Sequence, residues 1–349
     1  IGGNNFRQEV EDKDWHSAWF WSKQNFDIPK NTILANVPAN LRKINDSFLS
    51  RSDVGQGGVT YYVPTVPDVS TTPKFSGAPD NVRGSLGAAV KDTNRGLKEA
   101  LYTLGDEFES KKAGTRIVVV DAAALLAEVQ ANPVPFGFKN ASQNCVDAES
   151  GEYANGCSAA KVTDFLFWDQ FHPTTKAHAM IAQYAQDTDR LEAGKDVSLT
   201  IPYVANIEIR DRTFAGAIGG LGALLKKGES TLTLAGNNTY AGGTRIDNGA
   251  VRIASDRNLG AVSGQLTLRG GALSNSQSLV MTRNVRVEPS VSKNEIGGSA
   301  FGGTFKTDAG TVLTLQGNIL SGSGDIAKTG AGTLDLRSIM ADGRALTAI

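Results

Sequence analysis

The residues best suited to chemistry lie in an Asp-x-x-His-Pro sequence at positions 169–173. An Asp three residues before a His can turn back and accept the Nδ1 hydrogen of the imidazole, which fixes the tautomer of the ring. The Nε2 atom of His172 is then free to take a proton from a nucleophile. A structural His beside a capping Asp is the alternative interpretation of so short a spacing. The flanking sequence favours a general base at His172, oriented by Asp169.

The segments on both sides of this pair are expected to hold it in place. Pro173 suits the first position of a helix, where its missing N–H is no loss. On the other side, Phe165, Phe167 and Trp168 form an aromatic ledge that would desolvate the pair. We therefore expect His172 to lie at a strand-to-helix junction. The helix would bury the apolar residues that follow at helical spacing, which are Ala177, Ile181, Tyr184 and Ala185.

The same stretch resembles the last block of the GDSL (SGNH) family of serine esterases and lipases, in the branch that carries Phe-Trp-Asp-x-x-His-Pro-Thr. Residues 1–6 (Ile-Gly-Gly-Asn-Asn-Phe) are similar to the Gly-x-Asn-Asp block of that family, although Asn5 stands where the family has Asp. Residues 63–73 are similar to the Pro-x-x-Pro-Asp…Thr-Pro loop of the same branch. The resemblance covers residues 1 to about 190, with the three motifs in the order of the family.

The resemblance implies a Ser-His-Asp triad with His172 as the base and Asp169 as its orienter. It also implies that Asn4 donates to the oxyanion, and a side-chain donor of this kind stabilises a transition state by roughly 3–4 kcal/mol. The nucleophilic Ser and a second oxyanion donor, a Gly, come from blocks that precede the Asn4 block in the family. We therefore expect no nucleophile in this chain and no appreciable esterase activity from it alone. Ser85, in an Arg-Gly-Ser-Leu sequence that mimics the nucleophile motif, is instead expected to cap a helix.

The first part of the chain alternates helix and strand patterns. Helices are expected over 30–50, from Ser85 to Gly114 and over 122–129, with strands over 58–63 and 116–121. This order indicates a parallel sheet with right-handed crossovers. With the resemblance, it predicts an SGNH-hydrolase-like three-layer α/β domain over residues 1–195. We expect that domain to be truncated at its N-terminus, because the chain begins with Ile1 inside a motif.

From about residue 204 the sequence becomes rich in Gly and in short alternating runs. Residues 230–237 resemble 310–318 with one inserted residue, and 226–234 resemble 328–336. Recurring short strands with Gly and Asn corners indicate a solenoid, and an ordinary β-sandwich is the alternative.

Residues 236–244 (Gly-Asn-Asn-Thr-Tyr-Ala-Gly-Gly-Thr) are similar to the passenger-associated repeat of bacterial autotransporters, which forms coils of a right-handed β-helix. The resemblance predicts a linker or first coil over 196–220 and an all-β passenger β-helix over 221–349. The side chains expected to point inward are Leu232, Leu234, Val251, Ile253, Leu266 and Leu268.

Composition limits the partners that this chain is expected to have. Lys and Arg number 35 against 36 Asp and Glu, so the net charge of -1 gives no reason to expect nucleic acid as a partner. Cys145 and Cys157 lie in one polar loop, and we expect a disulfide between them, as suits an exported protein; two reduced thiols are the alternative. No further Cys or His lies near enough to complete a zinc site, and we expect no metal or cofactor.

The predicted function is that of a fragment of a secreted or surface-exposed autotransporter esterase or lipase acting on carboxylic esters, including lipids. A non-catalytic passenger, an adhesin or spacer with a decayed hydrolase domain, is the alternative. A subtilisin-type passenger protease would need a Gly-Thr-Ser block after the His, and the sequence has none. We expect the full-length protein to carry a C-terminal outer-membrane barrel that this chain lacks. As a hypothesis, Trp19 and Trp21 shape an acyl-binding pocket.

Overall fold

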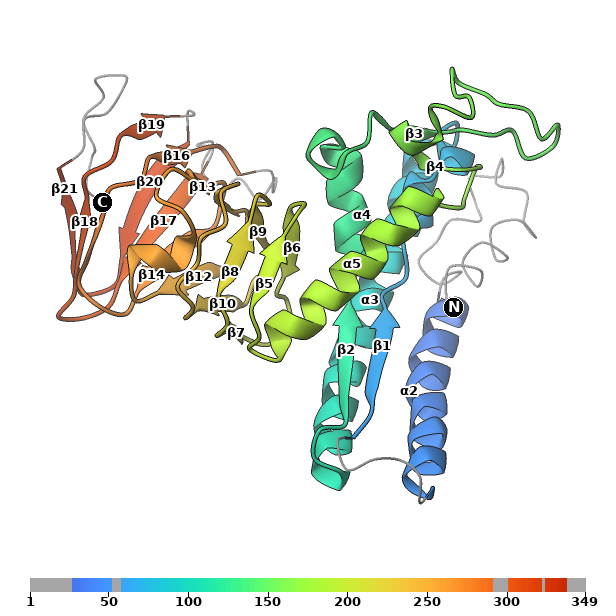
Figure 1. The fold of residues 1–349 in the computed structure, drawn as a ribbon, viewed down its shortest axis with the longest axis horizontal. Helices are drawn as coiled ribbons and strands as arrows, with labels where there is room; N and C mark the ends of the chain where they lie inside the picture. The colour runs from blue at the N-terminus through green and yellow to red at the C-terminus, as the bar shows by residue number, and fades with distance from the viewer. Residues whose placement is uncertain (1–26, 52–57, 291–300, 322–323, 338–349) are drawn as a thin grey trace. The chain divides into compact units, whose positions relative to one another are not determined.

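The computed structural model of this chain describes residues 27–51, 58–290, 301–321 and 324–337. Its internal contacts divide the chain into two compact units, Ile1–Thr188 and Asp189–Ile349, and each is described by itself (Figure 1). Within the described ranges, no helix combines the length and the hydropathy that a membrane crossing requires.

The first unit alternates helices with short parallel strands. Its elements are α2 (Asp27–Leu49), β1 (Thr60–Pro64), η3 (Val69–Thr71), η4 (Pro73–Phe75), α3 (Asp80–Lys111), β2 (Arg116–Val120), α4 (Ala122–Ala131), η5 (Val134–Phe136), β3 (Asn140–Asn144), η6 (Val162–Asp164), β4 (Phe165–Phe167) and α5 (Thr175–Glu192). The strands and helices predicted between residues 30 and 129 are confirmed, apart from the start of the long helix.

Parallel strand pairs form the centre of this unit. β1 and β2 pair in register from Thr60 opposite Arg116 to Pro64 opposite Val120, and β3 pairs in parallel with β4. In β2, Ile117 to Val120 are all β-branched and buried, as is typical of a parallel strand that is covered on both faces. Helix α3 packs on β2, and α2 packs beside α3 (Figure 1). Their shared core includes Leu101, Leu104 and Phe108, all fully buried, and each such side chain contributes roughly 1.5–3 kcal/mol.

The long helix starts earlier than predicted. α3 begins at Asp80, directly after Pro79, so Ser85 lies inside the helix and does not cap it. The carbonyl of Pro79 accepts from the backbone N–H groups of Val82 and Arg83. Asp80 adds a negative charge at the helix N-terminus, where the helix dipole favours it. This local arrangement outweighs the capping preference of Ser85.

The helix after the Asp-x-x-His sequence also starts at a different residue. α5 begins at Thr175, and Pro173 instead forms an isolated bridge with Phe167. The hydroxyl of Thr174 accepts from the N–H of Ala177 at 3.3 Å, as an N-cap residue does. The prediction that Pro173 occupies the first helical position is therefore wrong, because Thr174 provides a cap that Pro cannot.

The second unit consists of short strands connected by turns. They are β5 (Val197–Leu199), β6 (Tyr203–Asn206), β7 (Arg212–Phe214), β8 (Ile218–Gly220), β9 (Leu224–Lys227), β10 (Thr231–Leu234), β11 (Thr244–Ile246), β12 (Ala250–Ile253), β13 (Leu266–Leu268), β14 (Ala272–Asn275), β15 (Leu279–Met281), β16 (Val285–Val287), β17 (Phe301–Thr307), β18 (Val312–Leu315), β19 (Ile319–Ser321), β20 (Asp325–Thr329) and β21 (Thr333–Leu336), with η7 (Asp256–Leu259) between β12 and β13.

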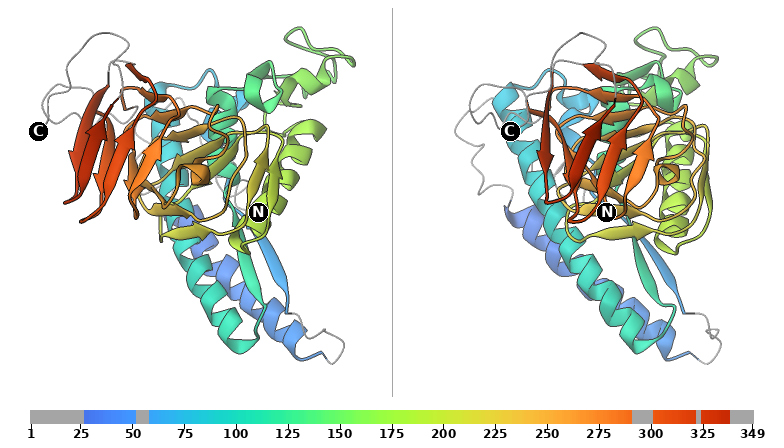
Figure 2. Two further views of the ribbon diagram at one scale, coloured as in Figure 1. Left: turned by 60° about the vertical axis from the view of Figure 1, so that its left-hand side comes forward. Right: turned by 90° about the vertical axis from the view of Figure 1, so that its left-hand side faces the viewer.

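These strands stack into parallel ladders, as in a β-helix. The two largest have the strand orders β20-β17-β14-β12-β10-β7 and β19-β16-β13-β11-β9-β6. Figure 2 shows the strands of this unit, coloured from yellow to red, lying side by side. Parallel pairing throughout the described part of the unit excludes the sandwich alternative, whose sheets are antiparallel. The six side chains predicted to point inward are all at most 1% exposed, which confirms the alternating pattern.

The Gly-Asn-Asn corner of the repeat has a direct physical role. A Cβ atom on Gly236 would lie 2.1 Å from the carbonyl oxygen of Gly216 in the preceding coil, so no other residue fits there. The side chain of Asn238 accepts from the N–H of Ile218 at 2.8 Å and donates to the carbonyl of Asn258 at 2.5 Å. The buried amide therefore joins one coil to the coils on both sides of it.

Candidate active site

A tight turn after β4 brings Asp169 and His172 together. The N–H of Trp168 donates to the carbonyl of His172 at 2.7 Å and closes the turn. Inside it, Asp169 Oδ1 accepts from the backbone N–H groups of Phe171 at 2.8 Å and of His172 at 2.7 Å. The imidazole Nδ1 of His172 lies 2.8 Å from Asp169 Oδ2 and 3.0 Å from Oδ1. The short spacing thus folds the ring back onto the carboxylate.

The environment keeps the Asp169 carboxylate charged. Burial acts to raise the pKa of Asp169, but the N–H groups of His172 and Phe171 and the ring of His172 outweigh it, so the pKa lies below its ordinary value. The Asp169 side chain is 21% exposed, whereas that of His172 is 66% exposed. Among the described residues, Nε2 of His172 has no hydrogen-bond partner. This nitrogen is the atom that a general base would use.

The aromatic residues before the turn do not shield the imidazole as predicted. Phe165 and Phe167 are 5% exposed and pack in the interior, while Trp168 is 40% exposed. All three residues of the short strand β4 are buried, so its rings complete the core. His172 remains open to solvent, and only the carboxylate side of the pair is partly desolvated.

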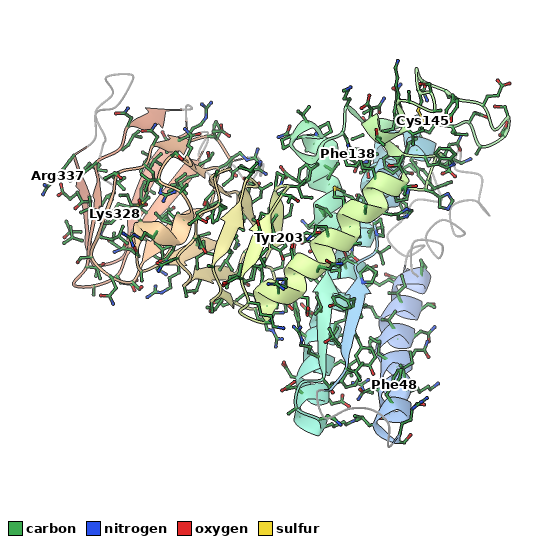
Figure 3. All side chains as sticks on the ribbon, in the orientation of Figure 1. Phe48, Phe138, Cys145, Tyr203, Lys328 and Arg337 are labelled. Atoms are coloured by element: carbon green, nitrogen blue, oxygen red, sulfur yellow. A yellow bond between two sulfur atoms is a disulfide. The ribbon has the colours of Figure 1, made fainter. Side chains whose placement is uncertain are left out.

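A disulfide-closed loop is hydrogen-bonded to the segment that leads into the turn. Cys145 and Cys157 are joined, and Cys145 is fully buried (Figure 3). The N–H of Cys145 donates to the carbonyl of Phe167 at 3.0 Å, and the N–H of Val146 donates to the carbonyl of Trp168 at 2.7 Å. The loop is therefore bonded to the last residues before Asp169.

His172 also forms part of the wall of a cavity of about 160 Å³. The wall comes from three segments that follow the carboxyl ends of the parallel strands β1, β2 and β4, where ligands of α/β proteins commonly bind. The segment after β1 belongs to residues 63–73, whose sequence is similar to the Pro-x-x-Pro-Asp…Thr-Pro loop. The wall residues are Pro67, Asp68, Val69, Thr71, Thr72, Ala123, Leu126, Ala127, Gln130, Phe167, Phe171, His172 and Pro173.

The structure brings Asp169 and His172 together but leaves other predicted site residues without a described position. Asn4 lies outside the described residues, as do Trp19 and Trp21. Ser85 is absent from the cavity wall. Sequence reasoning missed the contribution of α4 to the wall. The run Ala122–Ala124 directly after Asp121 was the available signal, because small side chains at the start of a helix leave room for a ligand.

The described ranges contain no group of three or more His, Cys, Asp or Glu side chains arranged to hold a metal ion. The contact of the His172 ring with Asp169 suits this turn to proton transfer at an oriented imidazole.

Comparison with known proteins identifies the family. Residues 1–185, more than half of the chain, match the model of the GDSL-like lipase/acylhydrolase family. The chain belongs to that family. Residues 224–253 match the passenger-associated-transport-repeat, so this GDSL hydrolase domain is followed by a repeat of autotransporter passengers.

Curated relatives fall into the same two groups. The chain is 40% identical over 119 residues to the adhesin BmaC autotransporter of Brucella suis, a match that covers 34% of this chain and 3% of the relative. It is 29% identical over 137 residues to the thermolabile hemolysin of Vibrio parahaemolyticus, covering 36% of this chain and 31% of the relative. Lipase 1 of Photorhabdus luminescens is 47% identical over 73 residues, a match that covers 20% of this chain and 11% of the relative. The chain thus spans less than a third of the length of each of these relatives.

Proposed function

We propose that this chain supplies the acid–base half of a serine esterase or lipase that hydrolyses carboxylic esters. The observation that carries the proposal is the 2.8 Å contact between His172 Nδ1 and Asp169 Oδ2, which leaves Nε2 accessible beside an apolar cavity. Membership of the GDSL-like lipase/acylhydrolase family supports the same class of reaction.

In the proposed mechanism, a Ser from sequence outside this chain attacks the acyl carbonyl of the ester. His172 Nε2 takes the proton of the Ser hydroxyl and then gives it to the departing alcohol, which leaves an acyl-enzyme. A water molecule attacks the acyl-enzyme while His172 again accepts a proton. Asp169 holds the ring in the correct tautomer and stabilises the imidazolium that forms. Asn4 is proposed to donate to the oxyanion in both steps.

The passenger repeat supports a location outside the bacterial cell. We infer that the full-length protein carries an outer-membrane barrel and presents the hydrolase domain at the cell surface or releases it. The relatives named as an autotransporter and a hemolysin are consistent with such a location.

A non-catalytic passenger is the second candidate, favoured by the 40% identity to an autotransporter named as an adhesin. The two candidates differ in what precedes the Asn4 block in the gene. A Gly-Asp-Ser-Leu block within about one domain length upstream supports the enzyme. Absence of that block supports an adhesin with a decayed hydrolase domain.

Ester turnover by the full-length protein tests the proposal. His172→Ala should lower kcat/KM for p-nitrophenyl butyrate by about 10²–10⁴-fold, the usual contribution of a general base. His178→Ala is the matched control, because His178 is exposed on α5 and absent from the cavity wall, and it should leave turnover unchanged. The 349-residue chain alone should show no appreciable turnover. Turnover by this chain that disappears in His172→Ala would reveal a nucleophile within it.

A further inference from the structure

We propose that the cavity beside His172 is the acyl-chain site of this hydrolase and that it selects linear acyl chains of about six carbons. The inference rests on the proposed ester hydrolysis and specifies the substrate class. The cavity meets the reaction centre directly, because His172 and Pro173 form part of its wall. An ester carbonyl placed at His172 would direct its acyl chain along the remaining wall.

Carbon atoms make up most of that wall. Ala123, Leu126 and Ala127 contribute from α4, and Phe167 and Phe171 contribute from the segment around the Asp169–His172 turn. Binding sites for hydrocarbon groups are lined in this way, with few polar groups.

The polar side chains in the wall are already hydrogen-bonded within the protein. The hydroxyl of Thr71 donates to the carbonyl of Asp68 at 2.8 Å, and that of Thr72 donates to the carbonyl of Val69 at 2.7 Å. Gln130 Nε2 donates to the carbonyl of Thr71 at 2.9 Å. The two hydroxyl hydrogens and one of the two amide hydrogens of Gln130 are therefore already used within the protein.

One oxygen of Asp68 is also hydrogen-bonded within the protein. Its Oδ1 atom accepts from the N–H of Ser70 at 3.0 Å and from the Ser70 hydroxyl at 2.6 Å. Its Oδ2 atom lies against α3, 3.1 Å from where a Cβ on Gly87 would be. A sugar or a charged head group would replace few of its hydrogen bonds to water here, whereas a hydrocarbon chain loses none.

Buried hydrogen bonds hold the α4 wall in position before any ligand binds. Asp121 caps α4 by accepting from the N–H of Ala124, and it also accepts from the hydroxyl of Thr65 at 3.1 Å. Lys98 Nζ donates to the same carboxylate at 2.6 Å. The Thr65 hydroxyl in turn accepts from the N–H of Ala123, a wall residue, at 3.0 Å. A preformed wall costs little to organise and discriminates between ligands by size.

The size of the cavity sets the chain length. An apolar protein cavity of about 150 Å³ holds benzene, a six-carbon ligand, so about 160 Å³ has room for about six carbons. Each methylene buried there should raise kcat/KM about fourfold, which corresponds to about 0.8 kcal/mol. The gain should continue from acetyl to hexanoyl esters and stop at longer ones, whose extra methylenes lie outside the cavity.

A series of p-nitrophenyl esters from acetate to dodecanoate, measured on the full-length protein, tests this assignment. Ala127→Phe places a ring at the rim of the cavity and should lower the ratio of the hexanoate to the acetate kcat/KM about 15-fold, the contribution of about two buried methylenes. Ala131→Phe is the matched control, because Ala131 is exposed on the same helix and outside the wall, and its length profile should match wild type.

Gln130→Ala is the second variant, and it removes the hydrogen bond between α4 and the Thr71 carbonyl. It should shift the preferred ester to a longer chain. Thermal unfolding followed by circular dichroism reports whether each variant is folded. His172-dependent hydrolysis whose length profile is the same in wild type, Ala127→Phe and Gln130→Ala would overturn the acyl site alone. Absence of ester hydrolysis, or hydrolysis that survives His172→Ala, would instead contradict the proposed function.

Discussion

The Asp169–His172 pair of the first unit and Lys226 of the second unit use polar side chains in opposite ways. In the first unit, Asp169 and His172 are partly exposed, and one ring nitrogen has no partner among the described residues. In the second unit, Lys226 is fully buried and its Nζ donates to the carbonyls of Lys227, Gly228 and Asn248. The first arrangement leaves an atom available for chemistry, and the second leaves none.

Arg283 extends the same contrast within the coils. Its buried guanidinium contacts Asp256 Oδ1 at 2.6 Å and also donates to several backbone carbonyls. The carbonyl acceptors belong to Asp256, Leu259, Gly260, Ala261 and Gly264. Corners of stacked coils contain carbonyls that no strand partner satisfies, and buried cations supply the missing donors. A buried cation such as Arg283, which is hydrogen-bonded to the protein, is therefore structural. The oriented ring of His172, whose Nε2 has no hydrogen-bond partner among the described residues, is a candidate for catalysis.

Among the changes that test this comparison, Asp169→Asn should have the largest effect, and the effect is on ester turnover. The amide cannot stabilise an imidazolium or hold the same tautomer, so ester kcat of the full-length protein should fall about 10³-fold or more. Asp164→Asn is the control, because Asp164 lies just before β4 and pairs with Lys139 at the surface. Its kcat should equal that of wild type. An equal loss in both variants would show that the turn is only structural.

The ionisation of Asp169 sharpens the same point. The depressed pKa of Asp169 means that its charge is present above the ordinary carboxyl range and is lost only as pH falls through the lower folded value. The carbon-13 chemical shift of the Asp169 carboxyl carbon should therefore keep its carboxylate value between pH 5 and 9. A change of that shift already near pH 6 would mean that the carboxylate protonates there.

Arg283→Met tests the structural side of the comparison. Removing the buried guanidinium leaves the partly exposed Asp256 and several backbone carbonyls without their donor, which should destabilise the second unit by about 3–5 kcal/mol. Arg286→Met, three residues on, is the control, since its pair with Glu288 is about half exposed and contributes at most about 1 kcal/mol. Urea unfolding followed by circular dichroism measures the loss of stability in both variants. Similar unfolding midpoints would contradict a structural role for Arg283.

Lys226→Met should have a smaller effect that depends on pH. Burial lowers the pKa of Lys226 from 10.5 to about 8, and the charges of Asp211, Glu208 and Asp247 only partly offset it. Between pH 8 and 10.5 the unfolded chain binds the proton that the folded chain has released, so stability rises with pH in this window. The unfolding free energy of wild type should therefore rise by about 2–3 kcal/mol relative to that of Lys226→Met between pH 8 and 10.5. A constant difference in unfolding free energy would show that Lys226 keeps its proton.

Local patterns in the sequence predicted the parts of the molecule that depend on near neighbours. The alternation Leu266-Thr267-Leu268 has the period of a strand, and both leucines are buried as predicted. The pairing of Asp169 with His172 was predictable for the same reason, because the two residues are three positions apart. The parallel order of β1 and β2 followed from the intervening helix.

The cavity could not be predicted from such patterns. Its wall joins segments near residues 67–72, 123–130 and 167–173, and nothing local in any of them specifies the others. The predicted start of α3 was wrong for a related reason. Ser85 has a good capping side chain, but Pro79 lies earlier in the chain and already ends the preceding loop, so the helix begins at Asp80. Where several nearby residues could each begin a helix, the packing of the whole domain decides which of them does.

The central claim is that His172 activates a Ser that this chain does not contain. A fluorophosphonate tests it most directly, because an activated Ser forms an O–P bond, fluoride leaves, and the base takes the Ser proton. In the full-length protein, peptide mapping by mass spectrometry should find a single adduct, on a Ser outside these 349 residues. Its rate of formation should fall at least 100-fold, the lower end of the contribution of a general base (about 10²–10⁴), in His172→Ala but not in His178→Ala. An adduct on Ser85 or another Ser of this chain, or equal labelling rates in both variants, would contradict the account.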